Sequence, residues 1–303
     1  MPKPAFLPHL PMRAHLPMRA RLLLPAALAA IAAAPLTFAP RPAATAPAAD
    51  LWPRWQTHDP ASTTTVDHSA YATLLDRYLT QHPDGINRVR YAALKANDQG
   101  ALEAYVDHLQ RIDPDGLNRS EQMAYWINFY NALTLLVVVE HYPVDSIRDI
   151  DLSPGLFSRG PWRKQLVTVN GEALSLDDIE HRILRPIWQD ARIHYAVNCA
   201  SIGCPNLQTE PFTATNRETL LEAGADAYVN HPRGVAMVEH PFLPDRLTAS
   251  SIYDWFAADF GGDDAGVLAH LRCYARDETS ARLADVETID AYRYDWALND
   301  SDS

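Results

Sequence analysis

Two cysteines and a histidine occupy one short stretch of this chain, and residues of these types at this spacing can form a reactive site. Cys199 and Cys204 are two of the three cysteines in the 303-residue sequence, and His194 precedes Cys199 by five residues. Apolar and more polar residues alternate over 193–198, which predicts a strand, and the glycine and proline within 203–205 predict a turn. Chemistry often occurs where a strand meets a loop, because the strand fixes geometry and the loop gives access.

The sequence leaves four interpretations of Cys199 and Cys204 open. The two form a disulfide, which leaves Cys273 unpaired and requires an oxidising compartment. Alternatively, Cys199 is a nucleophile, which requires a base such as a histidine within hydrogen-bond reach. A third interpretation is a metal site with a histidine, although the gap between the two cysteines is not a strong zinc signature. In the fourth, both are inert buried thiols.

The candidate partners of Cys199 come from three other places in the sequence. Ser175 and the carboxylate three residues later predict a helix whose first turns carry Glu180 and His181. His181 or His194 is the candidate base, and Glu180 or Asn128 is the candidate group that orients it. Asn128 or backbone N–H groups are also the candidate oxyanion donors. For Glu180 and His181 the competing interpretation is an acidic first turn that complements the helix dipole. For Asn128 it is a buried amide that ties loops to the core.

The surrounding pattern predicts an α+β protein with a helix-rich N-terminal half and hairpins in the C-terminal half. The central element is a helix between Asn118 and Pro143, apolar on nearly all sides and therefore buried, with Asn118 and Glu121 as a capping pair. Further helices are predicted over 66–81, 102–112, 218–229, 251–262 and 265–274. Hairpins are predicted over 165–174, around Asn170-Gly171, and over 235–248, with a last strand over 289–294.

The N-terminal residues have the features of an export signal. Arg19 and Arg21 precede an apolar run over 22–34 that is too short for a comfortable membrane span. Residues 35–50 are rich in proline and alanine and read as a linker. We therefore expect a signal peptide over 1–34, a linker over 35–50, and one globular domain over 51–303. This organisation predicts a periplasmic or secreted protein with no membrane span once the signal is removed.

Composition narrows the range of partners. The formal net charge is −12, and without the first fifty residues the chain has 21 basic and 37 acidic residues, or −16. Nucleic acid is therefore not the expected partner, because binding to phosphates needs clustered Lys and Arg. No Gly-rich phosphate loop, Gly-x-Ser-x-Gly or His-Glu-x-x-His motif occurs. We expect no cofactor and no metal, and a small-molecule or peptide substrate whose identity the sequence does not give.

Four segments together resemble the domain of unknown function 547 family: Tyr125–Leu133, Ser175–His181, His194–Pro205 and Tyr294–Asp300. The resemblance runs from about Tyr71 onwards. It implies that the following residues match positions in the motifs of the family: Trp126, Asn128, Asn131, Glu180, His181, His194, Cys199, Ser201 and Cys204. Some relatives keep the residue that matches Cys199 and lack the one that matches Cys204. This implies that neither a disulfide nor a metal site needing both cysteines is obligatory in the family, and it leaves Cys199 as the position of interest.

The sequence thus leads to two functional hypotheses. In the first, an exported hydrolase or acyl transferase uses Cys199 to attack an amide, ester or thioester carbonyl, and His181 or His194 moves the proton. In the second, a non-catalytic periplasmic binding or structural domain contains the same cluster as a buried network held by a Cys199–Cys204 disulfide. The spatial arrangement of these side chains is what distinguishes a catalytic group from a structural one.

Overall fold

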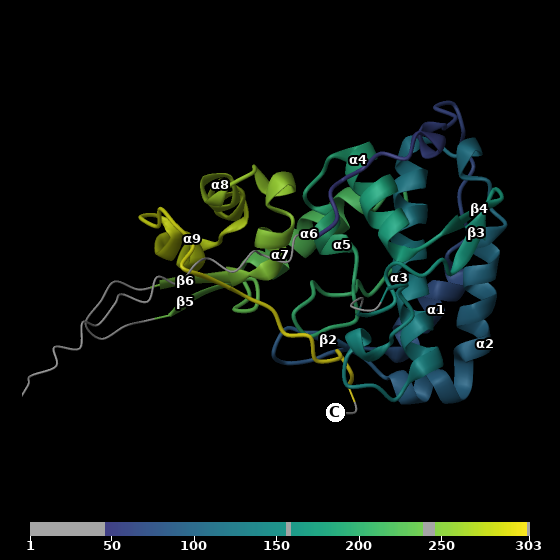
Figure 1. Ribbon diagram of the computed structural model, residues 1–303, viewed down its shortest axis with the longest axis horizontal. Coiled ribbons are helices and arrows are strands. Elements are labelled where there is room, and N and C mark those ends of the chain that lie inside the picture. The colour runs from purple at the N-terminus through teal and green to yellow at the C-terminus, as the bar shows by residue number, and fades with distance from the viewer. Residues whose placement is uncertain (1–45, 156–158, 239–245, 302–303) are drawn as a thin grey trace, which may run out of the picture. The chain divides into compact units, whose positions relative to one another are not determined.

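The computed structural model describes residues 46–155, 159–238 and 246–301. The predicted signal peptide and most of the predicted linker lie outside the described residues. The described end of that linker is irregular and contacts the folded chain, since the Asp50 N–H donates to the His181 carbonyl at 2.9 Å. The protein is α+β, with long helices in its N-terminal half and small sheets (Figure 1).

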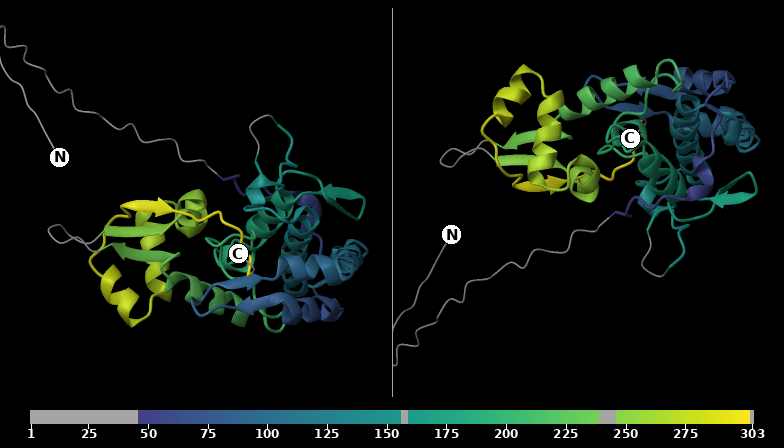
Figure 2. Two further views of the ribbon diagram at one scale, coloured as in Figure 1. Left: turned by 90° about the horizontal axis from the view of Figure 1, so that it is seen from below. Right: turned by 90° about the horizontal axis from the view of Figure 1, so that it is seen from above.

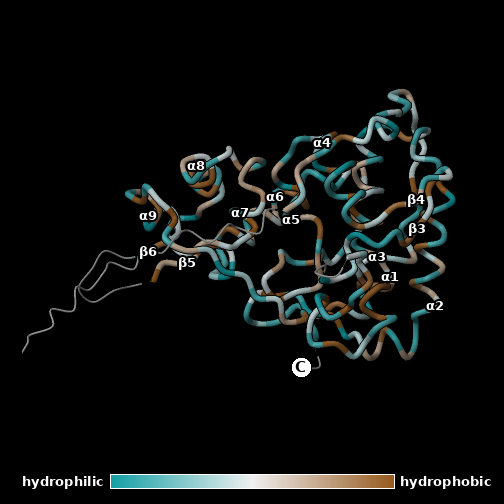
Figure 3. The backbone as a smooth tube through the Cα atoms, viewed as in Figure 1, coloured by the Kyte–Doolittle hydropathy of each residue, from teal (hydrophilic) through white to brown (hydrophobic). Residues whose placement is uncertain are grey.

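The N-terminal half is built from three helices that pack side by side (Figures 1 and 2). These are α1 (Ser69–Tyr78), α2 (Tyr91–Gln110) and α3 (Arg119–His141). The helix predicted over 66–81 ends at Tyr78, and its last residues form strand β1 (Leu79–Gln81), paired with β2 (Asn87–Val89). Along α2, Figure 3 shows hydrophobic and hydrophilic residues intermixed, as expected for a helix with one face on the core. Short 3₁₀ turns connect this region: η1 (Pro53–Gln56), η2 (Pro114–Gly116) and η3 (Ile147–Asp149).

Helix α3 is the predicted central helix, and its burial is confirmed. The Asn118 side chain caps it by accepting from the Ser120 and Glu121 N–H groups at 3.0 and 3.1 Å. Glu121 does not return the capping bond, because its carboxylate accepts from the backbone of Val66 and Ala214. Among the described residues α3 is the one helix long and apolar enough to cross a membrane, but its apolar window is 100% buried in the protein. It is therefore a core helix.

The Asn-Gly hairpin lies beside this helical layer and leads into the segment that carries two candidate residues. Strands β3 (Val167–Val169) and β4 (Glu172–Leu174) pair antiparallel, with Asn170 and Gly171 at φ +48° and +80° as a type I′ turn requires. Ser175 and Asp178 then exchange capping bonds of 3.1 and 2.7 Å. The helix that follows is π-helical in η4 (Asp178–Leu184) and continues as α4 (Arg185–Trp188).

The segment 193–198 is not the strand that its alternating pattern predicts. Ile193–Ala196 form one helical turn, α5, and Val197, which follows it, is extended. All four residues of α5 are buried, so the alternation does not separate a core face from a solvent face. The Asn131 side chain donates to the Ala196 carbonyl at 2.9 Å and accepts from the Asn198 N–H at 2.8 Å. A side chain from α3 therefore satisfies the backbone that a neighbouring strand would otherwise pair.

A second hydrophobic cluster lies around the C-terminal sheet (Figure 1). Strands β5 (Val235–Val238) and β6 (Arg246–Ser250) are antiparallel, as predicted, whereas β7 (Ala291–Arg293) pairs parallel with β6. The helical elements of this half are α6 (Arg217–Val229), α7 (Ser251–Trp255), η5 (Ala257–Phe260), α8 (Asp264–Tyr274) and α9 (Asp277–Leu283).

After β7 the chain returns from the second cluster to the first, visible as the yellow trace in Figure 1. The Ile202 N–H donates to the Ala297 carbonyl, and the Gly203 N–H donates to the Asp295 carbonyl, both at 2.8 Å. A Cβ on Gly203 would lie 2.7 Å from the Asp295 backbone nitrogen, so only glycine fits at this contact. This returning segment therefore packs directly on the loop that contains the two cysteines.

Candidate active site

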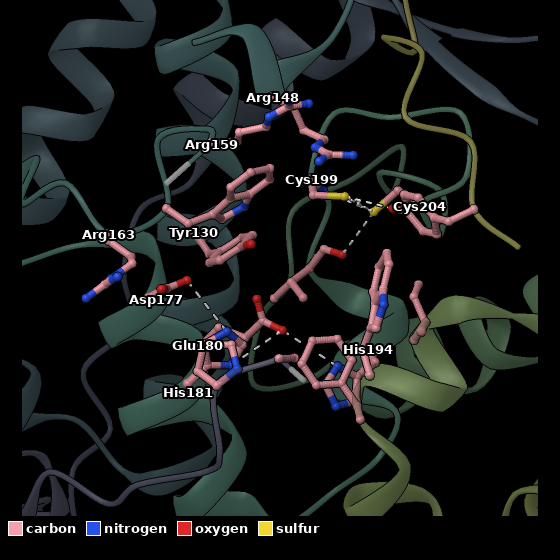
Figure 4. Close-up of a pocket in the computed structure, with 18 of the residues that line it drawn as sticks. Tyr130, Arg148, Arg159, Arg163, Asp177, Glu180, His181, His194, Cys199 and Cys204 are labelled. Carbon is pink, nitrogen blue, oxygen red and sulfur yellow. Dashed lines mark hydrogen bonds and ion pairs between the residues drawn. The ribbon is translucent and has the colours of Figure 1, made fainter. Parts of the chain in front are cut away.

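One cavity of about 600 Å³ brings most of the candidate residues together. The thiols of Cys199 and Cys204 lie on one side, and Glu180, His181 and His194 lie on the other (Figure 4). Its polar and aromatic wall is completed by Tyr130, Arg148, Ser153, Arg159, Trp162, Arg163, Asp177, Trp255, Phe256, Tyr294 and Trp296. The site therefore draws on α3, η4, α5, α7, the cysteine loop and the segment after β7.

Buried amide groups hold the loop that carries Cys199. Asn198 is buried, and its side chain accepts from the Ala200 N–H at 2.8 Å and donates to the Pro205 carbonyl at 2.7 Å. Ala200 adopts a positive φ of +58°, which directs the chain sharply after Cys199. The predicted turn is present, because the Cys204 N–H donates to the Ser201 carbonyl at 3.1 Å. Cys199 is partly exposed to the cavity, and Cys204 is buried beneath it.

The Cys199 thiol is surrounded by groups that can form hydrogen bonds with it. Its Sγ lies 3.1 Å from Cys204 Sγ, 2.9 Å from the Tyr294 hydroxyl and 3.3 Å from the Ser201 hydroxyl. The hydrogen bond from Cys204, together with those from Ser201 and Tyr294, lowers the pKa of Cys199 against the opposing effect of burial. Burial and the adjacent Cys199 raise the pKa of Cys204 well above its usual range. The pair thus has one thiol disposed to ionise and one that stays protonated as its donor.

Glu180 and His194 lie together, both buried, on the opposite side of the cavity. His194 Nε2 lies 2.7 Å from Asp259 Oδ2, and His194 Nδ1 lies 3.6 Å from Glu180 Oε1. Its ring stacks on Phe256 with centroids 4.1 Å apart. Burial opposes ionisation of Glu180, but His181, His194 and a nearby arginine outweigh it and lower its pKa to about 2. Because both His194 nitrogens face carboxylates, neither is free to accept the Cys199 proton.

The protonation of His181 follows from its partner Arg185. A guanidinium only donates, and Arg185 Nη1 lies 3.0 Å from His181 Nδ1, so this nitrogen is the acceptor. The ring proton is then on Nε2, which lies 3.6 Å from Asp177 Oδ1. Burial lowers the pKa of His181 to about 4, so the ring is neutral at pH 7. Arg185 is fixed in turn by Asp259 at 2.6 Å and by the Pro47 carbonyl at 2.7 Å.

Asp177 is the carboxyl group in this cavity whose pKa lies close to neutrality. Burial and the negative charge of Glu180 raise its pKa to about 7, and Arg163 partly offsets them. Glu180, three residues later, is shifted in the opposite direction. Two neighbouring carboxyls whose environments push their pKa values apart are typical of an acid–base pair in catalysis. Asp177 can therefore hold or release a proton near neutral pH.

The five residues expected to act together divide into two groups. Cys199, His181, His194 and Glu180 line the same cavity. Within the ranges that the structure describes, no hydrogen bond joins Cys199 to either histidine, so the expected thiol–imidazole pair is not formed in this conformation.

The contacts of the Asn128 side chain indicate a structural role rather than a catalytic one. Its side chain donates to the Phe212 carbonyl at 2.7 Å and accepts from the Phe212 N–H at 2.9 Å. It is absent from the described lining of the cavity, and it ties the loop before α6 to the core. The expected backbone oxyanion donors are also occupied, because the N–H groups of Cys199 and Ala200 donate to Cys204 Sγ and Asn198 Oδ1. Tyr294 is the hydroxyl donor nearest to the thiol.

Sequence reasoning did not select Asp177, Tyr294 or Asp259 as site residues. Asp177 was visible as a neighbour of His181 at i−4, and Tyr294 begins one of the segments that carries the family resemblance. Asp259 had no signal, because its contact with His194 spans 65 residues. In the described part of the chain, no group of three or more His, Cys, Asp or Glu side chains is arranged to hold a metal ion.

Comparison with known families supports the resemblance. Residues 114–229 match the family described as "Protein of unknown function, DUF547". The matched range contains α3, η4, α5 and the cysteine loop, and therefore Glu180, His181, His194, Cys199 and Cys204. The chain thus resembles a family of unknown function over a range that contains residues from both sides of the cavity. No curated protein and no solved structure matches the chain.

Proposed function

We propose that this protein is a thiol-dependent hydrolase or acyl transferase whose nucleophile is Cys199. The observation that supports this most strongly is the set of three hydrogen-bonding groups around its sulfur, at 2.9, 3.1 and 3.3 Å, at the wall of a cavity that also holds acid–base groups. Hydrogen bonds to the charged form favour the thiolate, which is the attacking species. The nucleophile is thus activated by donors rather than by direct proton transfer to a histidine.

In the proposed reaction the Cys199 thiolate attacks the carbonyl carbon of an amide, ester or thioester. The carbonyl π pair moves to oxygen, where the Tyr294 hydroxyl is the available donor, and the bond to the leaving group then breaks. The leaving group takes a proton from the carboxyl of Asp177. Water or another acceptor attacks the acyl–Cys199 thioester, returns a proton to Asp177 and releases the thiolate.

The buried network around His181 and His194 has a positioning role in this proposal. Arg185 fixes the His181 tautomer so that Nε2–H faces Asp177, and Asp259 holds both Arg185 and His194. Glu180 stays ionised and keeps a negative charge beside Asp177, which favours the protonated acid there. The histidines thereby determine where the mobile proton is kept without contacting the thiol.

The site is proposed to act outside the cytoplasm, in the periplasm or after secretion. The supporting observation is the positively charged and apolar pattern over 19–34, followed by a Pro/Ala-rich segment. The substrate is a small molecule or a peptide. These proposals are consistent with a net charge of −12, which does not favour nucleic acid.

One observation favours a second candidate, a non-catalytic domain held by a Cys199–Cys204 disulfide. The two sulfurs are 3.1 Å apart, and an S–S bond of about 2.05 Å needs only a small approach. In an oxidising compartment such a pair forms readily. The two candidates differ in one measurable property, the reactivity of Cys199 in freshly isolated native protein.

The test is alkylation of the native protein by iodoacetamide at neutral pH, with mass spectrometry to locate the label. Cys273, exposed on α8, serves as an internal reference thiol. We expect Cys199 to react faster than Cys273, and Cys199→Ser to abolish turnover in a screen of activated esters and thioesters, with Cys273→Ser as the matched control. A quantitative Cys199–Cys204 disulfide, with no activity lost on substitution, supports the non-catalytic domain instead.

A further inference from the structure

Three arginines of the cavity have no carboxylate partner. Arg148, Arg159 and Arg163 line the same cavity as Cys199 (Figure 4). Over the described ranges, no Asp or Glu oxygen lies within ion-pair distance of any of them. By contrast, Arg185 and Arg192 pair with carboxylates at 2.6 Å. In a protein of net charge −12, these three cations gather around one cavity, where Arg163 interacts with Asp177 without forming an ion pair.

Aromatic packing holds Arg148 in its place. It belongs to η3, and its guanidinium carbon lies 5.1 Å from the centroid of the Trp296 ring. Trp296 stacks on Trp255 at 5.5 Å and meets Trp162 edge-on at 5.7 Å. In Figure 4 the Arg148 side chain lies on the thiol side of the cavity. The cation and a flat apolar wall are thus presented together, next to the nucleophile.

The described residues next to the other two arginines are held by hydrogen bonds and close packing. The Ser153 N–H donates to the Gly160 carbonyl at 3.2 Å, and the Arg163 N–H donates to the Ser153 hydroxyl at 3.1 Å. Gly160 has a φ of +80°, and a Cβ there would lie 1.9 Å from the Trp162 ring. Only glycine permits this packing. Arg163 interacts electrostatically with Asp177, next to which it is drawn in Figure 4, and Arg159 lines the same cavity as Arg148.

We propose that this cavity binds an acyl substrate carrying an oxyanionic group, a carboxylate or a phosphate, which Arg148, Arg159 and Arg163 receive. The acyl part of this statement rests on the proposed function, whereas the anion site does not. Guanidinium groups match both oxyanions because their N–H groups form a planar fork. The wall of Trp162, Trp255 and Trp296 covers the apolar part of the same substrate.

Binding is measured first on the Cys199→Ser protein, where no turnover occurs, by calorimetry with glutarate, inorganic phosphate and neutral glutaramide. We expect glutarate or phosphate to bind about tenfold or more tightly than glutaramide, and to weaken between about 20 and 300 mM salt. Tighter binding of glutarate identifies a carboxylate site, and tighter binding of phosphate identifies a phosphate site. Equal, salt-insensitive binding of all three compounds overturns the proposal.

Arginine variants then localise the site. In the Cys199→Ser background, Arg148→Gln and Arg163→Gln should each weaken anion binding by about tenfold. The matched control is Arg111→Gln, since Arg111 is exposed at the end of α2 and does not line the cavity. Arg163 is exposed, so its variant is expected to fold even if loss of the Arg148–Trp296 contact is disruptive. A loss in Arg111→Gln as large as in Arg163→Gln overturns the assignment.

Turnover separates this inference from the proposed function. With active Cys199, the monoester of p-nitrophenol with glutarate should have a higher kcat/KM than p-nitrophenyl butyrate, and Arg163→Gln should remove the preference. Anion binding without hydrolysis of either ester rejects the hydrolase and keeps the anion site. Cys199-dependent hydrolysis of both esters at equal rates, unchanged in Arg163→Gln, rejects the anion site and keeps the hydrolase.

Discussion

Replacing Asp177 by Asn should change how the stability of the protein depends on pH. The folded protein holds the Asp177 proton with a pKa of about 7, against 3.8 in the unfolded chain. Between these values the unfolded chain ionises first, so the wild-type protein loses stability as pH rises from about 4 to about 7. The loss is complete above pH 7. Asparagine is neutral throughout, so the variant does not have this contribution.

The size of the effect follows from the pKa shift. One pKa unit corresponds to about 1.36 kcal/mol, so the whole shift amounts to about 4 kcal/mol above pH 7. The Asp177 side chain retains 22% exposure, and screening by solvent reduces the effect. Between pH 5 and pH 8.5, we therefore expect the free energy of unfolding of Asp177→Asn to increase relative to that of wild type by about 1–2 kcal/mol.

Urea unfolding at half-unit steps of pH measures this difference, and the change with pH is the quantity of interest rather than the offset at one pH. Asp76→Asn is the matched control. Asp76 is exposed on α1, and its replacement removes the same charge from the chain as Asp177→Asn does. Parallel pH profiles for wild type and Asp177→Asn, or the same divergence in Asp76→Asn, would refute the assignment of a buried, proton-holding carboxyl group to the cavity.

Three further predictions concern the core, the thiol and the N-terminus. Ile127→Ala should destabilise the protein by about 2–5 kcal/mol in denaturant unfolding, because Ile127 is 0% exposed in the centre of α3; a loss below about 0.5 kcal/mol contradicts this packing. Tyr294→Phe removes a donor 2.9 Å from Cys199 Sγ and should slow its alkylation at neutral pH, with the midpoint of the rate–pH profile moving upward; an unchanged midpoint excludes the hydroxyl as a thiolate donor. Sequencing of the cell-fractionated protein should give a mature N-terminus between Ala39 and Asp50, and an intact Met1 in the cytosol contradicts export.

The elements that the sequence predicts well are those with local signals. The cap at Asn118, the Asn170-Gly171 turn and the Ser175 cap each act within a few residues, and all three are present. The largely apolar sequence of α3 correctly indicates a helix buried on nearly every side. At these positions the local hydrogen bonds and turn conformation form even though tertiary contacts take Glu121 from the Asn118 cap.

The segment 193–198 shows where local reasoning fails. A short buried run has the same composition as a strand or as a helical turn, and periodicity alone does not separate them. Its conformation is decided by Asn131, which is more than sixty residues away in the sequence and takes both the Ala196 carbonyl and the Asn198 N–H. The amides that sequence reasoning assigned to catalysis or scaffolding are therefore scaffolding at both Asn128 and Asn131.

The sequence predicted several of the residues that lie in the candidate site, but it did not predict which of their side chains contact each other. His181, His194 and Glu180 share a cavity with Cys199, as expected from the segments that carry the family resemblance. Their pairing is different because Arg185 and Asp259 occupy the imidazole nitrogens, and these contacts depend on how η4, α5 and η5 pack. Long-range charge pairs of this kind leave no spacing pattern in a single sequence.

The return of the chain onto the cysteine loop places a condition on when the thiol gains all of its contacts during synthesis. Tyr294 contacts Cys199 across 95 residues of sequence. At a synthesis rate of about 5–20 residues per second, the ribosome adds the tyrosine about 5–20 s after the cysteine. Until then Cys199 lacks this donor, and its loop lacks the backbone partners at Asp295 and Ala297. In a nascent chain the contacts of Cys199 with Cys204 and Ser201 can form locally, whereas the contact with Tyr294 forms only when the segment after β7 has docked.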